Sequence, residues 1–94
     1  MIILTITQLI LRRRFHKLTL CFVLMKIKAG FVESVMNELN KIPEVMETYG
    51  VTGGIDIITK VEGKDVETIA KTILAKIHKI EGVDRTQTHI VVPM

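Results

Sequence analysis

The sequence predicts an α+β fold of the ferredoxin-like type, an α/β sandwich with one antiparallel four-stranded sheet and two helices. Three observations lead to this prediction. The 94 residues suffice for one small domain. Strand-type and helix-type patterns follow one another in the order βαββαβ, and the two middle strands flank a pair of glycines. Two split βαβ units of this kind arrange the strands in the order 4-1-3-2, with both helices on one face of the sheet.

The apolar patterns define the first strand and the first helix. Residues 18–28 form a continuous apolar run followed by alternation, which is typical of a central strand. In residues 31–42 apolar side chains recur at helical spacing, and Pro43 ends the helix. The stripe consists of Val32, Val35, Met36, Leu39 and Ile42.

The middle of the chain predicts a β-hairpin. Residues 45–52 and 55–61 are rich in β-branched and apolar residues, and Gly53-Gly54 between them predicts a two-residue primed turn. Only glycine adopts positive φ without steric cost, and paired glycines leave backbone N–H groups uncovered for a small anion. Asp56 places a charge where strand propensity disfavours one. Its position therefore calls for an explanation.

The second helix and the last strand follow the hairpin. Asp65 is placed as a helix N-cap, and Gly82 is the expected C-terminal punctuation. Residues 84–92 read as a strand with Pro93 beyond it. The apolar stripe of the helix consists of Val66, Ile69, Ala70, Ile73, Leu74, Ile77 and Ile80.

The distribution of charge argues against a nucleic-acid-binding surface. The chain has 13 Lys and Arg residues and 10 Asp and Glu residues. Four of the basic residues lie in residues 1–17, so from residue 18 onward nine basic residues stand against all ten acidic ones. The chain also has only three Phe and one Tyr, and no basic stripe with interleaved aromatic residues.

The single cysteine, Cys21, lies among apolar residues. One cysteine excludes an internal disulfide framework, and these neighbours predict a small buried hydrophobe rather than a reactive thiol. A reducing cytoplasm fits this composition.

Residues 1–17 combine a short apolar run with the basic cluster Arg12, Arg13, Arg14 and Lys17. The run is shorter than the roughly 20 residues of a membrane span, and its charges follow the apolar part instead of preceding it as in a signal peptide. An arm that packs on a partner and a membrane-surface patch are two interpretations. We favour a third, a translated leader upstream of the true start, with the domain in residues 18–94.

The strand sequences predict association between copies. A solvated antiparallel sheet alternates apolar and polar residues, yet residues 20–25, Ile57 with Ile58, and residues 90–92 are apolar at both parities. Such a second apolar face exceeds what soluble monomers usually expose. We expect a homodimer whose open sheet faces pack together, with further assembly built on it.

The sequence shows no residue pattern typical of a catalytic or metal-binding site. The three histidines, His16, His78 and His89, lie in the tail, the second helix and the last strand, without the spacing of a metal pair. No Ser/His/Asp or Cys/His set is readable, and Gly53-Gly54 lacks the following helix of a nucleotide loop. The sequence therefore predicts no metal, no cofactor and no enzyme.

A polar set in apolar surroundings remains as the candidate site: Thr52, Gly53, Gly54, Asp56, Thr86, Gln87 and Thr88. In the simpler interpretation Asp56 caps its own turn and the threonines are ordinary strand residues. In the functional interpretation the set binds a small zwitterion. Glycine N–H groups would receive a carboxylate, Asp56 would pair an ammonium group, and threonine hydroxyls would complete the site.

With these residues in hand, residues 20–92 resemble the ligand-binding (RAM) domain of the Lrp/AsnC family of feast/famine transcription regulators. The run Tyr49-Gly50-Val51-Thr52-Gly53-Gly54-Ile55-Asp56 is close to the family's Tyr-x-Val-Thr-Gly-x-(aromatic)-Asp hairpin. Ile42-Pro43-Glu44-Val45 at the helix exit and Gly82-Val83 leading to Thr86-x-Thr88 also match.

The resemblance implies a ferredoxin-like fold, sheet-to-sheet dimers that assemble into tetramers or octamers, and amino-acid effectors bound in clefts between dimers. Gly53, Gly54, Asp56, Thr86 and Thr88 would line that cleft. The family often has an aromatic residue at the position of Ile55, which leaves the ligand open. Residues 1–17 cannot supply the three helices of a helix-turn-helix domain, so the chain resembles a stand-alone form, associating with full-length regulators and not itself reading DNA.

Two other functions share this fold and remain open from sequence. One is an ACT-like regulatory subunit of a metabolic enzyme. The other is a small dimeric ferredoxin-like barrel enzyme, which needs a deep pocket with a histidine, and His89 is the candidate for that role. The preferred hypothesis is a non-enzymatic module that binds an amino acid and oligomerises.

Overall fold

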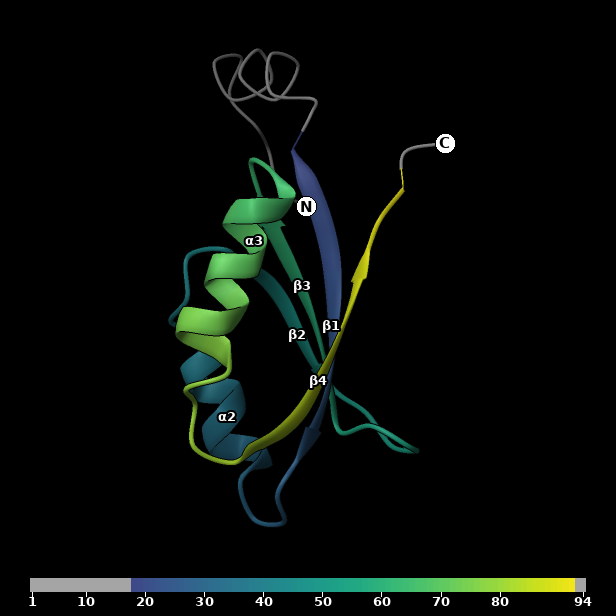
Figure 1. The fold of residues 1–94 in the computed structure, drawn as a ribbon. Coiled ribbons are helices and arrows are strands. Elements are labelled where there is room, and N and C mark those ends of the chain that lie inside the picture. Colours follow the sequence, from purple (N-terminus) through teal and green to yellow (C-terminus); the bar gives the residue numbers. More distant parts are fainter. Residues whose placement is uncertain (1–17, 93–94) are drawn as a thin grey trace, which may run out of the picture.

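The computed structural model describes residues 18–92 and shows one four-stranded antiparallel sheet with the helices packed on one face (Figure 1). The strand order is β2-β3-β1-β4, which confirms the predicted order. The interpretations of residues 1–17 fall outside the described residues. In chain order the elements are β1 (Thr19–Ile27), α2 (Val32–Leu39), β2 (Val45–Gly50), β3 (Ile57–Gly63), α3 (Val66–Thr72), η1 (Ile73–Ile77) and β4 (Val83–Ile90).

The core lies between the sheet and the helices. Alternate residues of β1 point into it, so Cys21, Val23 and Met25 are fully buried. Ile57 and Val61 of β3 pack beside them, and the helices contribute a further apolar set: Val35, Leu39, Ile69, Ile73 and Ile77. Burial raises the pKa of the Cys21 thiol, so Cys21 is the buried small hydrophobe that its neighbours predict.

The second helix begins as predicted but changes its geometry. The Asp65 carboxylate accepts a hydrogen bond of 2.7 Å from the Thr68 N–H, and this bond lowers the pKa of Asp65. From Ile73 the backbone continues as a π-helix, in which the His78 N–H donates to the Ile73 carbonyl at 2.9 Å. Only part of the predicted apolar stripe is buried: Ile69, Ile73 and Ile77 face the core, whereas Val66 is 54% and Leu74 63% exposed.

The hairpin exists and its register, with Gly50 opposite Ile57, centres the connection on Gly53-Gly54, but the strands end earlier than predicted. Strand β2 ends at Gly50 and β3 begins at Ile57, so residues 51–56 form the connection. Gly53 has a positive φ of 123° and Gly54 does not, so the turn is not of type I′, which needs positive φ at both central residues. In Figure 1 this connection projects away from the helix layer.

The sheet face opposite the helices, called the open face below, is apolar along its centre. Cross-strand partners share a face, and the register places Phe22 beside Lys60 and His89, and Leu24 beside Ile58 and Gln87. Tyr49 of β2 lies next to Ile58. The predicted second apolar surface is therefore present at the centre of the sheet, bordered by charged residues such as Lys26 and Lys60 and by polar residues of β4.

Candidate ligand-binding site

A groove on the open face lies where the hairpin connection meets β1 and β4. Its volume is about 420 Å³, the size of a site for a small molecule. Three residues of the predicted set, Gly54, Thr86 and Gln87, border it. The lining of this hairpin groove consists of Leu24, Lys26, Gly54, Ile55, Arg85, Thr86 and Gln87.

Asp56 ties the hairpin to β1. Its carboxylate Oδ2 accepts a hydrogen bond of 2.8 Å from the Ile27 N–H and lies 3.5 Å from the Lys26 Nζ. Its own N–H donates to the Met25 carbonyl at 2.9 Å. The Ile27 N–H, with Lys26 as a smaller contributor, lowers the pKa of Asp56, so the side chain is an anion at neutral pH.

These contacts change the simpler interpretation of Asp56. The carboxylate bonds to the neighbouring strand β1 and not to its own turn. The side chain is 26% exposed, so one part of it still faces solvent beside the groove. Asp56 is therefore fixed to β1 beside two lining residues of the hairpin groove, Lys26 and Ile55.

Lys26 and Arg85 give the groove a positive wall. They are cross-strand partners between β1 and β4, next to an irregularity in the register at Ile27. Both line the groove, and the Lys26 side chain is 40% exposed. Like charges directly opposite each other on a sheet repel, so this pair favours a negative charge between or above them.

The side chains of Thr86 and Thr88 in β4 are on the face of the sheet that the helices cover. Thr86 pairs with Met25 and Thr88 with Val23, whose side chains point into the core. The Thr86 Oγ1 is 2.6 Å from the His78 Nε2, so its hydroxyl is already engaged while the residue borders the groove. Thr52 and Gly53 lie in the exposed connection. The lining of the groove includes neither of them, nor Asp56 or Thr88.

Sequence reasoning missed the two basic residues of the groove. The alternation of β1 places Lys26 on the open face. That Arg85 is its cross-strand neighbour is known only from the register of β1 with β4. Arg85 carries no motif of its own. The signal was the pairing of two cations across strands, and a single sequence does not contain that pairing.

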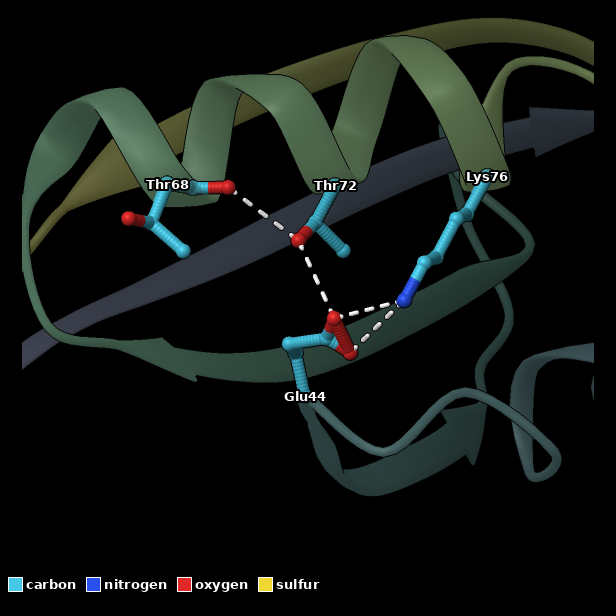
Figure 2. A network of polar contacts seen from close by, with 4 residues as sticks. All are labelled: Glu44, Thr68, Thr72 and Lys76. Carbon is cyan, nitrogen blue, oxygen red and sulfur yellow. Dashed lines mark hydrogen bonds and ion pairs between the residues drawn. The ribbon is translucent and has the colours of Figure 1, made fainter.

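A second polar cluster lies on the helix side of the sheet (Figure 2). The Lys76 Nζ donates to both carboxylate oxygens of Glu44, at 2.7 and 3.2 Å, and the buried Thr72 hydroxyl lies 3.4 Å from Glu44 and 3.1 Å from the Thr68 carbonyl. The hydrogen bond from Lys76 lowers the pKa of Glu44. This cluster ties the start of β2 to the π-helix.

A hollow of similar volume, about 420 Å³, lies between the helices and is called the helix-side hollow below. None of the predicted site residues line it, and its Lys76 is engaged by Glu44. Its lining consists of Phe31, Ser34, Glu38, Lys76, Lys79, Ile80 and Glu81. The hairpin groove is therefore the better candidate.

Within residues 18–92 no group of three or more His, Cys, Asp or Glu side chains is arranged to hold a metal ion. Over the same residues no helix has the length and apolar character that a membrane span requires.

The family model for the Lrp/AsnC ligand binding domain matches residues 20–93, nearly the whole described chain. The chain belongs to the Lrp/AsnC family. This membership confirms the resemblance that the hairpin and the end of the first helix indicated, and the ferredoxin-like βαββαβ fold agrees with it.

Relatives of this Lrp/AsnC chain are named as transcriptional regulators. The HTH-type transcriptional regulator FL11 of Pyrococcus furiosus is 40% identical over 72 residues, which are 77% of this chain and 47% of that protein. The chain thus spans about half the length of this curated relative. TTHA0845 from Thermus thermophilus is a solved structure with 32% identity and a TM-score of 0.77, and the match covers 81% of this chain and 95% of that one.

The Lrp/AsnC fold also occurs in the L-Met complex of the transcriptional regulator NMB0573 from Neisseria meningitidis. That structure is 19% identical with a TM-score of 0.78, and the match covers 99% of this chain and 58% of that one. At this identity the likeness concerns the fold alone.

Proposed function

We propose that this Lrp/AsnC domain is a non-enzymatic effector-binding and oligomerisation module whose effector is an amino acid. The observation that carries the proposal is the hairpin groove, which joins the family hairpin to charged groups of both signs. An amino acid offers an ammonium group and a carboxylate, and a site for it needs an anion and donors of hydrogen bonds.

The predicted residues would divide these tasks. Gly53 and Gly54 carry N–H groups that no Cβ covers, and these would receive the α-carboxylate. Asp56, already fixed by the Ile27 N–H, would pair the ammonium group with no need to reorganise. Thr86 borders the groove of the same chain, whereas Thr52 and Thr88 would come from a neighbouring copy that closes the groove into a cleft.

The partner in this proposal is a second copy of the chain. The open face has an apolar patch of Phe22, Leu24, Ile58 and Tyr49 with Lys60, Lys26, Gln87 and His89 around it, the arrangement of an interface core with its rim. A homodimer through this face would cover Phe22, which is 36% exposed, and Tyr49, which is 55% exposed. Tetramers or octamers would build on the dimer. Mixed assembly with full-length regulators of the same family, in the cytoplasm, follows as a further expectation.

A thermal-shift screen of the twenty amino acids on the full chain tests the function. Binding to the native state raises its stability by mass action, so a millimolar ligand with a dissociation constant of roughly 10 µM adds about 2.7 kcal/mol. We expect one amino acid, or a small group of similar ones, to raise the unfolding midpoint. If none does so at millimolar concentration, the amino-acid assignment is wrong.

Light scattering at micromolar protein concentration tests the assembly. A solution mass of at least two chains is expected, and the mass of a single chain would contradict the dimer.

A further inference from the structure

The hairpin groove has a local charge that differs from that of the rest of the domain. From residue 18 onward nine basic residues stand against ten acidic ones, so the domain as a whole is close to neutral. The ionisable residues of the groove lining are nevertheless Lys26 and Arg85, with Asp56 as the adjacent carboxylate. A ligand in the groove therefore meets two cations, and the nearest carboxylate in the described contacts is Asp56, 3.5 Å from the Lys26 Nζ.

The two neighbouring cations destabilise the sheet by charge repulsion. Lys26 and Arg85 are direct cross-strand partners, a placement in which like charges destabilise a sheet. Asp56 relieves this only in part, because its Oδ2 is 3.5 Å from the Lys26 Nζ and also accepts the Ile27 N–H at 2.8 Å. A second negative group in the groove would remove the remaining repulsion.

We propose that the effector is an acidic amino acid, whose side-chain carboxylate is bound by Arg85 and Lys26. This inference rests on the proposed amino-acid function and names its ligand class. The planar guanidinium of Arg85 presents paired donors that match a carboxylate, and Lys26 adds a point charge next to it.

An acidic amino acid matches the groove at three points. Its ammonium group pairs with Asp56, its α-carboxylate meets the N–H groups of the glycine turn, and its side-chain carboxylate lies against the cations. A neutral amino acid fulfils the first two points and leaves the third unmatched. Asp56 has a second task in this arrangement, because it positions Lys26 at the wall of the groove.

Calorimetry on the full chain separates ligand charge from ligand shape. L-Glutamate and L-glutamine have nearly the same shape and differ in the charge of the side chain, as do L-aspartate and L-asparagine. We expect at least one acidic member to bind roughly 10- to 100-fold more tightly than its amide, the range of a hydrogen bond to a charged group. Inorganic phosphate is the third probe and should bind more weakly than the acidic amino acid.

Three variants locate the effect. Arg85→Gln and Lys26→Gln should each reduce the preference for the acidic ligand over its amide, and affinity for the amide should change little. Lys64→Gln is the control, because it removes the same charge from an exposed residue outside the groove lining. Unfolding midpoints without ligand show whether each variant is folded.

The outcomes are distinct. If acid and amide bind equally, or if folded Arg85→Gln keeps the full preference, the acidic ligand is wrong while amino-acid binding stands. Phosphate binding as tight as that of the acidic amino acid, and lost in Arg85→Gln, would show a general anion site and overturn the inference. If no amino acid binds at all, the proposed function fails together with it.

Discussion

Replacement of Phe22 by alanine tests whether the open face is the dimer interface. Phe22 lies on the central strand β1, with Lys60 on one side and His89 on the other. Its position on the open face follows from its neighbours Cys21 and Val23, which are fully buried on the opposite face. The side chain is 36% exposed in the single chain, so a partner can still bury it.

The size of the effect follows from that exposure. A Phe side chain contributes roughly 200 Å² of surface, so about 70 Å² remains for a partner to cover. At about 25 cal/mol per Å² this corresponds to about 1.8 kcal/mol for each copy. A symmetric dimer buries the residue twice, and alanine retains a little of the area. We therefore expect Phe22→Ala to weaken dimerisation by about 3 kcal/mol, roughly 100-fold in the dissociation constant.

Sedimentation equilibrium over a range of protein concentrations measures this constant. Leu74→Ala is the matched control, because Leu74 is 63% exposed but belongs to the π-helix on the other side of the sheet. Removal of this larger exposed apolar area should leave dimerisation unchanged. The reasoning is refuted if folded Phe22→Ala dimerises as wild type does, or if Leu74→Ala weakens the dimer equally.

Four further predictions concern stability and nucleic acid. Glu44→Gln should lower the free energy of unfolding at pH 7 by roughly 0.5–1 kcal/mol. Folding lowers the pKa of Glu44, so the stabilisation that its carboxylate provides is present above the unfolded-state pKa and is lost as pH falls through the folded-state pKa. The urea midpoints of variant and wild type should therefore converge in acid. Gly82→Ala should destabilise by roughly 2–4 kcal/mol, since φ is +101° and a Cβ would lie 2.4 Å from a neighbouring side chain. Gly30→Ala, with φ of +88° and open space around it, should cost only about 1 kcal/mol in the same denaturation assay. In filter binding, any retention of duplex DNA should be independent of sequence. A plot of log binding constant against log salt concentration should have a slope no steeper than roughly −4, because residues 12–17 contain four basic residues. Retention of one preferred sequence would contradict this prediction.

The sequence predicts the fold well because its local and global signals agree. The apolar run of β1, the helical spacing before Pro43 and the cap at Asp65 each specify one element, and the order of the elements leaves few topologies. The two middle strands are shorter toward the turn than the sequence predicts. Regular pairing ends at Gly50 and Ile57, where the Asp56 carboxylate accepts from the Ile27 N–H. Beyond that point the Val51 N–H still donates to the Asp56 carbonyl at 2.9 Å.

The site is less accessible to sequence reasoning because it depends on register. The π-helix has no motif in this sequence, and the pairing of Lys26 with Arg85 joins residues far apart in the chain. The role of Asp56 shows the same limit. A charged residue within an apolar strand pattern indicated that Asp56 has a specific role. Its hydrogen-bond donor, the Ile27 N–H, is known only from the structure.

Amide NMR on the full chain, titrated with the amino acid that the thermal-shift screen selects, tests the central claim most directly. If an amino acid binds in the hairpin groove, the signals of Gly53, Gly54 and Asp56 should shift together and saturate with one dissociation constant. The signals of Glu38 and Lys79, which line the helix-side hollow, should stay in place. Saturable shifts confined to Glu38 and Lys79, with the glycine turn unaffected, would contradict the account.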